Sequence, residues 1–270
     1  RLFVTQSAVS LRIHRLEELL GHPLFVRSKA GAEITPSGRE FVVFAKSLLR
    51  TWEQARQQIA IPSGFSQSLT IGAQISLWPR LGWRWVDGLR LAVPDLGIRA
   101  ELGMPETLTR AMTEGVMQIS LTYQPSFHPG LRIEKVMQDE LVLVAPWQGA
   151  KVEDLVGKYA FIDWGPDFVQ FHNQHMPQLT NPGLTLVMGS LSAGYVMSRG
   201  LAGYLPARVV DGHLAAGELH LVEGAPTFTR TAWSVWRDDL DVDLAAVARK
   251  ALFQVAEMAA GETEAIVHQI

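Results

Sequence analysis

The chain has 270 residues, 47% of them hydrophobic, no Cys and a formal net charge of −3. This composition is typical of a soluble globular protein with one large domain or two to three small ones. The lack of Cys excludes disulfides, thiol redox chemistry and Cys-based metal sites, and it favours a reducing, cytoplasmic location. No apolar run approaches the ~18 residues of a membrane-spanning helix, and the first residues do not resemble a signal peptide.

The charge is unevenly distributed along the chain. Residues 1–60 contain nine Lys/Arg and five Asp/Glu, whereas the remainder contains fifteen and twenty-two. A basic N-terminal part on an acidic body predicts that one end binds a polyanion and that the rest has another role.

The first predicted element is a helix that begins after Thr5, a favourable N-cap, and ends at Gly21, a favourable C-terminal residue. Its apolar side carries Ala8, Val9, Ile13, Leu16 and Leu20. Its other side carries Gln6, Ser7, Ser10, Arg12 and Arg15. Short hydroxyls, an amide and guanidinium groups are the side chains that read base edges and hold phosphates. The alternative is an ordinary amphipathic helix whose polar side is solvated.

A short hairpin is predicted next, from residues 24–27, a turn at 29–31, and residues 32–34. Its basic residues, Arg27 and Lys29, are suited to contact phosphate. A helix followed by a small basic hairpin predicts a winged helix-turn-helix over residues 1–34.

Thr35 and Pro36 predict the start of a second helix over residues 35–60. Its apolar stripe, repeated every three or four residues, consists of Phe41, Phe44, Ala45, Leu48, Leu49, Trp52, Ala55 and Ile59. The small wing cannot cover a stripe of this length. The stripe is therefore expected to pack either on the body of the same chain or on another chain.

Residues 61–66 are rich in Pro, Gly and Ser, so they predict a hinge. Beyond it, short apolar strands alternate with helices. Strands are predicted at 68–72, 98–102, 118–122, 140–145, 160–162, 203–205 and 232–236. Helices are predicted at 77–93, 106–114, 191–198 and 242–258. Such alternation is typical of an α/β domain with a mainly parallel sheet.

Ligands of open α/β sheets collect beyond the carboxyl ends of strands, often at helix N-termini. Four segments meet this description: 73–76, 103–106, 163–168 and 189–192. The candidate effector-binding residues are Gln74, Ser76, Trp78, Met104, Asp163, Trp164, Asp167, Phe168 and Ser190. Two alternatives remain open: Ser76 is an ordinary helix cap, and the aromatic side chains belong to a core near the hinge.

Several segments resemble the LysR-type transcriptional regulators. The N-terminal resemblance is carried by residues 5–10 (TQSAVS), Ile13, Leu16, Glu17, 19–21 (LLG), Leu24, Phe25, Arg27 and 35–38 (TPSG). The C-terminal resemblance is carried by Leu69, Ile71, Gly72, Pro94, 139–144 (DELVLV) and 199–206 (RGLAGYLP). Within the family, residues 76–78, 164–168, Trp233 and Trp236 are most similar to the HdfR-like branch.

The resemblance implies a transcription regulator that binds double-stranded DNA. Gln6, Ser7, Ser10 and Arg12 would enter the major groove, and Arg27 and Lys29 would meet phosphate. The second helix would pair antiparallel with a second copy in a homodimer or homotetramer. The remainder would be a bilobed, periplasmic-binding-protein-like effector domain with a small molecule between its lobes, for which the family uses the loop at Ser76. Lobe 1 would comprise 67–144 and 235–270, and lobe 2 would comprise 145–234, with crossings near Ala145 and Ser234.

Two departures from the family pattern bear on these expectations. The family has a scaffold helix and the start of a second helix before Arg1, so the helix-turn-helix is expected to be truncated. The family often has Asp where Gln118 stands. The alternative function is a stand-alone small-molecule binding protein with a non-functional DNA-binding remnant.

Other chemistry has little support in the sequence. His172 and His175 are three residues apart, a spacing that two metal ligands on one helix face can have, but no third ligand follows at a suitable spacing. No nucleophile elbow, phosphate loop or dinucleotide fingerprint occurs. We therefore expect no enzyme activity, no catalytic residues, no metal and no cofactor.

Overall fold

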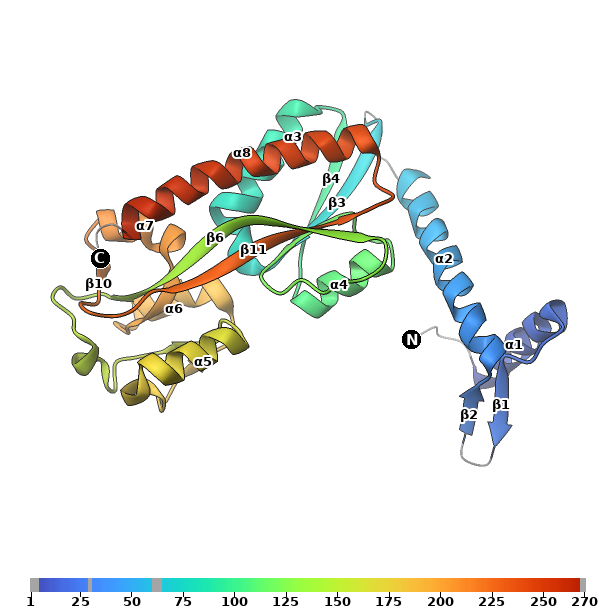
Figure 1. Ribbon diagram of the computed structural model, residues 1–270, viewed down its shortest axis with the longest axis horizontal. Coiled ribbons are helices and arrows are strands. Elements are labelled where there is room, and N and C mark those ends of the chain that lie inside the picture. The colour runs from blue at the N-terminus through green and yellow to red at the C-terminus, as the bar shows by residue number, and fades with distance from the viewer. Residues whose placement is uncertain (1–4, 29–30, 60–64, 268–270) are drawn as a thin grey trace. The chain divides into compact units, whose positions relative to one another are not determined.

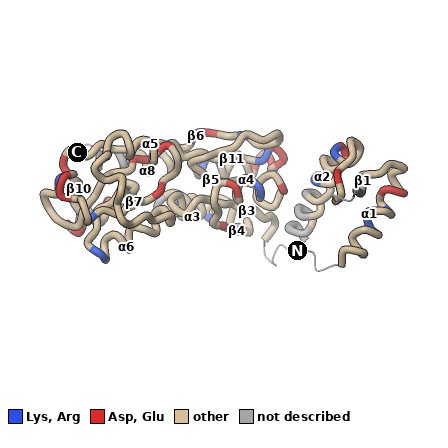
Figure 2. The backbone as a smooth tube through the Cα atoms, turned by 90° about the horizontal axis from the view of Figure 1, so that it is seen from below, with Lys and Arg blue, Asp and Glu red and all other residues tan. Residues whose placement is uncertain are grey.

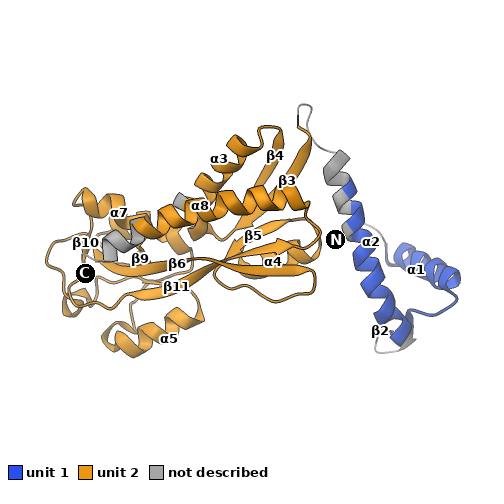
Figure 3. Cartoon of the chain, turned by 45° about the horizontal axis from the view of Figure 1, so that its top comes forward, with its two compact units in different colours: residues 1–60 blue, residues 61–270 orange. Residues whose placement is uncertain are grey.

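The computed structural model describes residues 5–28, 31–59 and 65–267. The chain divides into two compact units, residues 1–60 and 61–270 (Figure 3). The first unit contains α1 (Gln6–Leu20), β1 (Phe25–Ser28), β2 (Gly31–Ile34) and α2 (Pro36–Ile59).

Both ends of α1 follow the sequence prediction. The Thr5 hydroxyl accepts a hydrogen bond from the Ala8 amide at 3.3 Å. Gly21 adopts a left-handed conformation, with φ of 69°, and its amide donates to the Glu18 carbonyl at 3.3 Å. These contacts satisfy backbone groups that would otherwise lack partners at the helix ends.

The hairpin of β1 and β2, which we call the wing, approaches the first turn of α2 closely at Gly38. The Thr35 hydroxyl caps α2 by accepting the Gly38 amide at 2.9 Å. A Cβ at Gly38 would lie 2.3 Å from the Leu24 carbonyl oxygen, so only glycine fits there. The Glu17 carboxylate accepts the Leu24 amide at 2.7 Å and thereby ties α1 to the wing. The predicted hairpin and second helix are thus confirmed, and the wing packs against the first turn of α2.

The second unit is built on one large sheet. Its strands are β3 (Gln67–Ala73), β4 (Leu96–Leu102), β5 (Ile119–Thr122), β6 (Leu131–Ala145), β9 (Gly203–Pro206), β10 (His220–Leu221) and β11 (Phe228–Arg237), with a separate pair β7 (Phe161–Ile162) and β8 (Thr185–Leu186). Its helices are α3 (Trp83–Ala92), α4 (Pro105–Thr113), α5 (Pro166–His175), α6 (Ser192–Ser198), α7 (Ala207–Ala215) and α8 (Val242–Val267). None of the helices in the described ranges is long and apolar enough to cross a membrane.

The sheet is mixed, which corrects the prediction of a mainly parallel one. The strand order is β10-β6-β11-β5-β3-β4, with β9 also paired to β6. β3 is parallel to β4 and β5, but β6 and β11 pair antiparallel along ten residue pairs and form the long central ribbon in Figure 1. Only the apolar second half of β6 was predicted, because the adjacent Glu134 and Lys135 interrupt the apolar–polar alternation in the first half.

The β6–β11 ribbon connects two separate cores. On β6, Met137 packs in the core beneath α3 and α8, whereas Leu141 packs in the core that contains Phe168. On β11, Phe228 contacts the second core and Ala232 belongs to the first. The chain therefore passes between lobes at 137–141 and 228–232, earlier than the expected positions at 145 and 234.

The predicted helix 77–93 is divided in the structure. A 3-10 turn, Ile75–Leu77, and a π-helical turn, Trp78–Gly82, precede α3. Pro79 cannot donate a backbone hydrogen bond, which favours irregular geometry at this start. The Trp85 indole donates to the Ala248 carbonyl at 2.9 Å and fixes α3 against α8.

Candidate functional site

A cavity of about 560 Å³ lies at the carboxyl ends of β3 and β4, where the two lobes meet. We call it the cleft cavity. Segments 74–76, 102–107, 123–124, 163–166 and 187–189, with Leu191 and Arg230, form its wall. The wall contains five of the nine predicted effector residues, namely Gln74, Ser76, Met104, Asp163 and Trp164.

The other four predicted residues do not line the cleft cavity. Trp78 is 7% exposed and packs against Trp83, with ring centroids 4.7 Å apart. Phe168 is fully buried in the lobe 2 core. Asp167 is exposed in the first turn of α5, and Ser190 is buried. Trp78 and Phe168 thus belong to the cores, whereas Trp164 lines the cleft cavity.

Hydrogen bonds fix the cavity wall in position. The Gln74 side-chain oxygen accepts the Thr122 hydroxyl at 2.8 Å and the Tyr123 amide at 2.7 Å. The Trp164 indole donates to the Tyr204 carbonyl at 2.9 Å. Asp163 accepts the Gly165 amide at 2.8 Å. These polar groups are held by the protein itself, so the wall is preformed.

The lobes touch at Ser76. Its hydroxyl accepts the backbone amide of Ser190 at 3.2 Å. The neighbouring Gly189 has φ of 53°, and a Cβ there would lie 2.9 Å from the Ser76 hydroxyl oxygen. The Ser76 hydroxyl therefore joins the lobes in this structure, and its O–H can still donate to a ligand.

A buried charged cluster at the base of the cavity was missed by the sequence analysis. It consists of Tyr123, Asp139, Arg208 and Arg230. Arg208 Nε donates to Asp139 Oδ1 at 3.0 Å, and Tyr123 Oη donates to Asp139 Oδ2 at 2.6 Å. Arg208 Nη1 also donates to the Pro79 carbonyl at 2.8 Å, and Nη2 donates to the Ser76 carbonyl. The cluster ties the first loop of the cavity to α7 and the ribbon.

Burial and charge determine the ionisation of this cluster. Burial opposes the ionisation of Asp139, but Arg208 and Arg230 outweigh it, so the pKa of Asp139 lies below its ordinary value. Burial raises the pKa of Tyr123 to about 12, although both guanidinium groups oppose this shift. Two cations therefore face one carboxylate and a neutral phenol.

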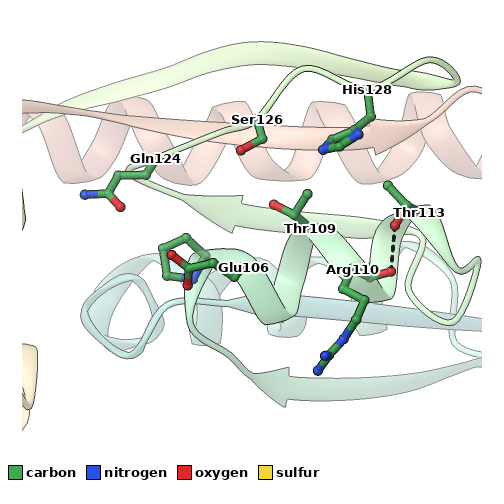
Figure 4. A pocket seen from close by; sticks show the side chains of 8 residues that line it. Glu106, Thr109, Arg110, Thr113, Gln124, Ser126 and His128 are labelled. Carbon is green, nitrogen blue, oxygen red and sulfur yellow. Dashed lines mark hydrogen bonds between the residues drawn. The ribbon is translucent and has the colours of Figure 1, made fainter. Parts of the chain in front are cut away.

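A second, more polar hollow of about 380 Å³ adjoins α4 (Figure 4). It shares Pro105, Glu106 and Gln124 with the cleft cavity, and its other lining residues are Thr109, Arg110, Thr113, Ser126 and His128. The Arg110 side chain points away from His128 and Ser126 in this view. The hollow has no large apolar wall, so the cleft cavity is the better candidate for a small organic molecule.

The two histidines considered as metal ligands lie in different surroundings. His172 is 1% exposed and stacks on Tyr159, with centroids 5.5 Å apart. His175 is exposed, and its Nδ1 contacts the Phe171 carbonyl at 2.9 Å. Within the described ranges, no cluster of three or more potential ligands forms.

The burial of His172 predicts a pH effect on stability. Burial lowers its pKa, and Nε2 has no hydrogen-bond partner among the described residues. The unfolded chain then binds a proton near pH 6.5 that the folded chain resists. We expect the free energy of unfolding to be unaffected above that pH and to fall below it, by up to ~1.4 kcal/mol per pH unit. Urea unfolding at pH 7.5, 6.5 and 5.5 measures this, and His172→Phe should make the decline shallower; equal declines would contradict it.

The predicted DNA-contacting residues lie on the first unit. Gln6, Ser7 and Ser10 line an open hollow of about 660 Å³ along α1, together with Leu11, His14 and Glu17. Arg12 and Arg15 are exposed but outside this lining. Arg27 is on β1, and Lys29 lies outside the described residues. Both basic and acidic positions occur along α1 (Figure 2).

Comparison with known protein families identifies both units. The model described as "LysR substrate binding domain" matches residues 62–252. The model described as "Bacterial regulatory helix-turn-helix protein, lysR family" matches residues 1–39. The chain belongs to the LysR family of transcriptional regulators.

Curated relatives of this LysR-family chain are named "HTH-type transcriptional regulator HdfR". The protein from Salmonella schwarzengrund is 28% identical over 243 residues, which cover 89% of this chain and 85% of the relative. The protein from Salmonella typhimurium is 27% identical over the same shares of the two chains.

Three solved structures share the fold. LysG from Corynebacterium glutamicum, with the effector Arg bound, gives a TM-score of 0.60 at 16% identity, covering 95% of this chain and 90% of that one. ArgP from Mycobacterium tuberculosis gives 0.59 at 20% identity, covering 95% and 89%. A full-length OxyR variant from Pseudomonas aeruginosa gives 0.59 at 21%, covering 93% and 89%. These likenesses confirm the fold class expected from the sequence.

In this LysR-family regulator, the side chain of Gln118 makes a structural contact. Its side-chain oxygen accepts the Thr70 amide at 2.7 Å at the edge of β3. Gln118 does not line the cleft cavity.

Proposed function

We propose that this LysR-family regulator reads DNA with α1 and the wing, and that a small molecule in the cleft cavity alters this reading. One observation carries the proposal: a single chain joins an exposed hydrogen-bonding face on α1 to a cavity at the junction of two lobes. The comparison with the family favours this function over a stand-alone binding protein with a DNA-binding remnant.

The helical positions of the DNA-binding candidates suggest different roles for them. Gln6 and Ser10 are four residues apart and therefore share a face of α1, whereas Arg12 is two positions from Ser10 and projects to another side. We assign Gln6, Ser7 and Ser10 to base edges, and Arg12, Arg15, Arg27 and Lys29 to phosphates at the margins of the groove.

This assignment predicts two kinds of mutant. Gln6→Ala should cost about 1–3 kcal/mol at the preferred site and relax the preference for one base pair. Arg12→Ala should weaken binding to all sequences and reduce the slope of log affinity against log salt by roughly one. Fluorescence anisotropy on specific and scrambled duplexes, at several salt concentrations, distinguishes them. A loss restricted to the specific duplex in Arg12→Ala would reverse its assignment.

The remaining parts follow from the same proposal. The winged unit would comprise residues 1–34, α2 would be the dimerisation helix, and two lobes would enclose the effector. We further propose that the chain works in the cytoplasm, where it meets DNA, and that it acts by binding without catalysis.

Footprinting on the regulator's own promoter, with and without metabolite pools, tests the proposed function. We expect protection of two half-sites and a changed pattern when an effector is present. The absence of any sequence-selective protection would favour the stand-alone binding protein.

A further inference from the structure

The cleft cavity contains a buried cation that the protein only partly satisfies. Arg230 is the only Lys or Arg among the described residues that line this cavity. Its side chain is 8% exposed. Its guanidinium carbon lies 3.6 Å from the centroid of the Tyr123 ring and 4.5 Å from that of Trp164, so the group is held between aromatic rings of both lobes.

The hydrogen bonds of Arg230 are incomplete. Nη2 donates to Asp139 Oδ2 at 3.2 Å. That oxygen already accepts Tyr123 Oη at 2.6 Å and Arg208 Nη2 at 3.2 Å. Arg230 Nε is buried and has no acceptor within the described part of the chain. A buried donor of a charged group without an acceptor is costly, so an added anion near it is stabilised.

The net charge of the buried cluster also favours an added anion near Arg230. Arg208 and Arg230 together carry two positive charges, while Asp139 carries one negative charge. The adjacent carboxylate on the ribbon, Glu140, instead accepts the Thr229 hydroxyl at 2.7 Å. The buried cluster at the floor of the cavity therefore carries a net charge of +1.

The rest of the wall combines neutral polar groups, such as Gln124 and Thr107, with apolar and acidic side chains. Its apolar part consists of Leu102, Met104, Val187, Met188 and Leu191, which are between 48% and 67% exposed. Its acidic groups are Glu106 and Asp163. The apolar side chains favour a hydrocarbon body, whereas the two carboxylates would repel a second anionic group on the ligand.

We propose that the cleft cavity binds a small monocarboxylate, with its anionic end at Arg230 and its apolar body against Met104 and Met188. The inference rests on the proposed function, because it concerns the effector of the same cavity. The ligand contacts both lobes through the Tyr123–Arg230–Trp164 stack. Dicarboxylates and uncharged analogues bind more weakly.

Three six-carbon probes test the proposal: hexanoate, hexanamide and adipate. Ligand-observed NMR titration of the full chain should give the tightest binding for hexanoate. Loss of a charge-assisted hydrogen bond corresponds to roughly 10- to 100-fold weaker binding for hexanamide. Adipate, with its second carboxylate near Glu106 and Asp163, should also bind less well. Equal binding of hexanamide and hexanoate would overturn the proposal, as would tighter binding of adipate.

Two variants locate the anion. Arg230→Met should weaken hexanoate binding roughly 10- to 100-fold, whereas Arg230→Lys, which keeps the charge, should retain most of it. Asp163→Asn should strengthen adipate binding more than hexanoate binding, because adipate carries the second carboxylate that Asp163 repels. Unchanged hexanoate affinity in a folded Arg230→Met, or unchanged adipate affinity in Asp163→Asn, would contradict the assignment.

DNA binding distinguishes this inference from the proposed function. If the chain protects its promoter selectively but binds none of the three probes, the monocarboxylate inference fails and the regulator function stands. If it binds hexanoate with the predicted selectivity but never protects DNA selectively, the inference stands and the regulator function fails.

Discussion

Replacing Asp139 with alanine should lower the free energy of unfolding of residues 61–270 by about 3–5 kcal/mol. The carboxylate is 1% exposed and is the acceptor for Arg208, Arg230 and Tyr123. Without it, two buried guanidinium groups face each other uncompensated, which is far more costly than losing a surface pair. Seven of the eight Trp lie in residues 61–270, so tryptophan fluorescence during urea unfolding reports this unit.

Two controls separate charge burial from general damage. Tyr123→Phe removes the hydrogen bond to Asp139 and the acceptor that Arg208 Nη2 contacts at 2.8 Å, and should cost about 1–3 kcal/mol. Arg249→Gln breaks an exposed pair with Glu134 and should cost less than about 1 kcal/mol. Because the pKa of Asp139 is lowered, its contribution should be complete above about pH 4 and lost as the pH falls further. A loss in Asp139→Ala no larger than that in Arg249→Gln would contradict the role of the cluster.

Placing glutamates on the α2 stripe should convert dimers into monomers. Phe44, Leu48, Leu49 and Trp52 are all more than 60% exposed on this helix, an unusual state for such residues. Burial of a large apolar side chain contributes about 1.5–3 kcal/mol. The double variant Leu48→Glu, Trp52→Glu removes two such side chains from each chain, and therefore four from a symmetric dimer. The Kd of the dimer should rise by roughly four orders of magnitude or more. Sedimentation velocity over a range of concentrations measures the change.

Lys46→Glu provides a control with the same change of two charge units per chain. Lys46 lies outside the apolar stripe, and by helical spacing it projects away from Leu48. We expect this variant to remain dimeric and to bind a two-half-site duplex, whereas the double variant should lose the gain in affinity from the second half-site. Unchanged sedimentation of the double variant would mean that residues 61–270 hold the chains together.

Local signals in the sequence were sufficient for the helix ends and the cavity loops. Thr5, Gly21 and Thr35 act through contacts with residues three positions away, so their roles can be predicted without a fold. Gln74, Met104 and Trp164 follow strands, and the structure brings these three side chains to the lining of one cavity, as the rule that ligands collect beyond strand ends predicts.

The residues that were missed depend on contacts distant in the sequence. Asp139 and Arg230 are register partners on β6 and β11, but the antiparallel pairing that joins them was not predicted. If this strand pairing had been predicted, the opposite charges of Asp139 and Arg230 would have been expected directly across the ribbon from each other. Trp78 and Phe168 were predicted to line the cavity, but both lie in the cores. An aromatic residue near a loop can turn to the cavity or to the core, and only the packed structure decides between them.

The pairing of β6 with β11 has a mechanical consequence. The two passages between the lobes are hydrogen-bonded to each other from Leu131 to Leu141, with an irregularity at Ala232 and Trp233. Two separate linkers would allow the lobes to swing apart, but a paired ribbon resists bending within its plane and yields more readily in torsion. We therefore expect the lobes to rotate about the ribbon axis. Proteins that contact lobe 1 and lobe 2 would then sense an effector as a change in the angle between the lobes rather than in their separation.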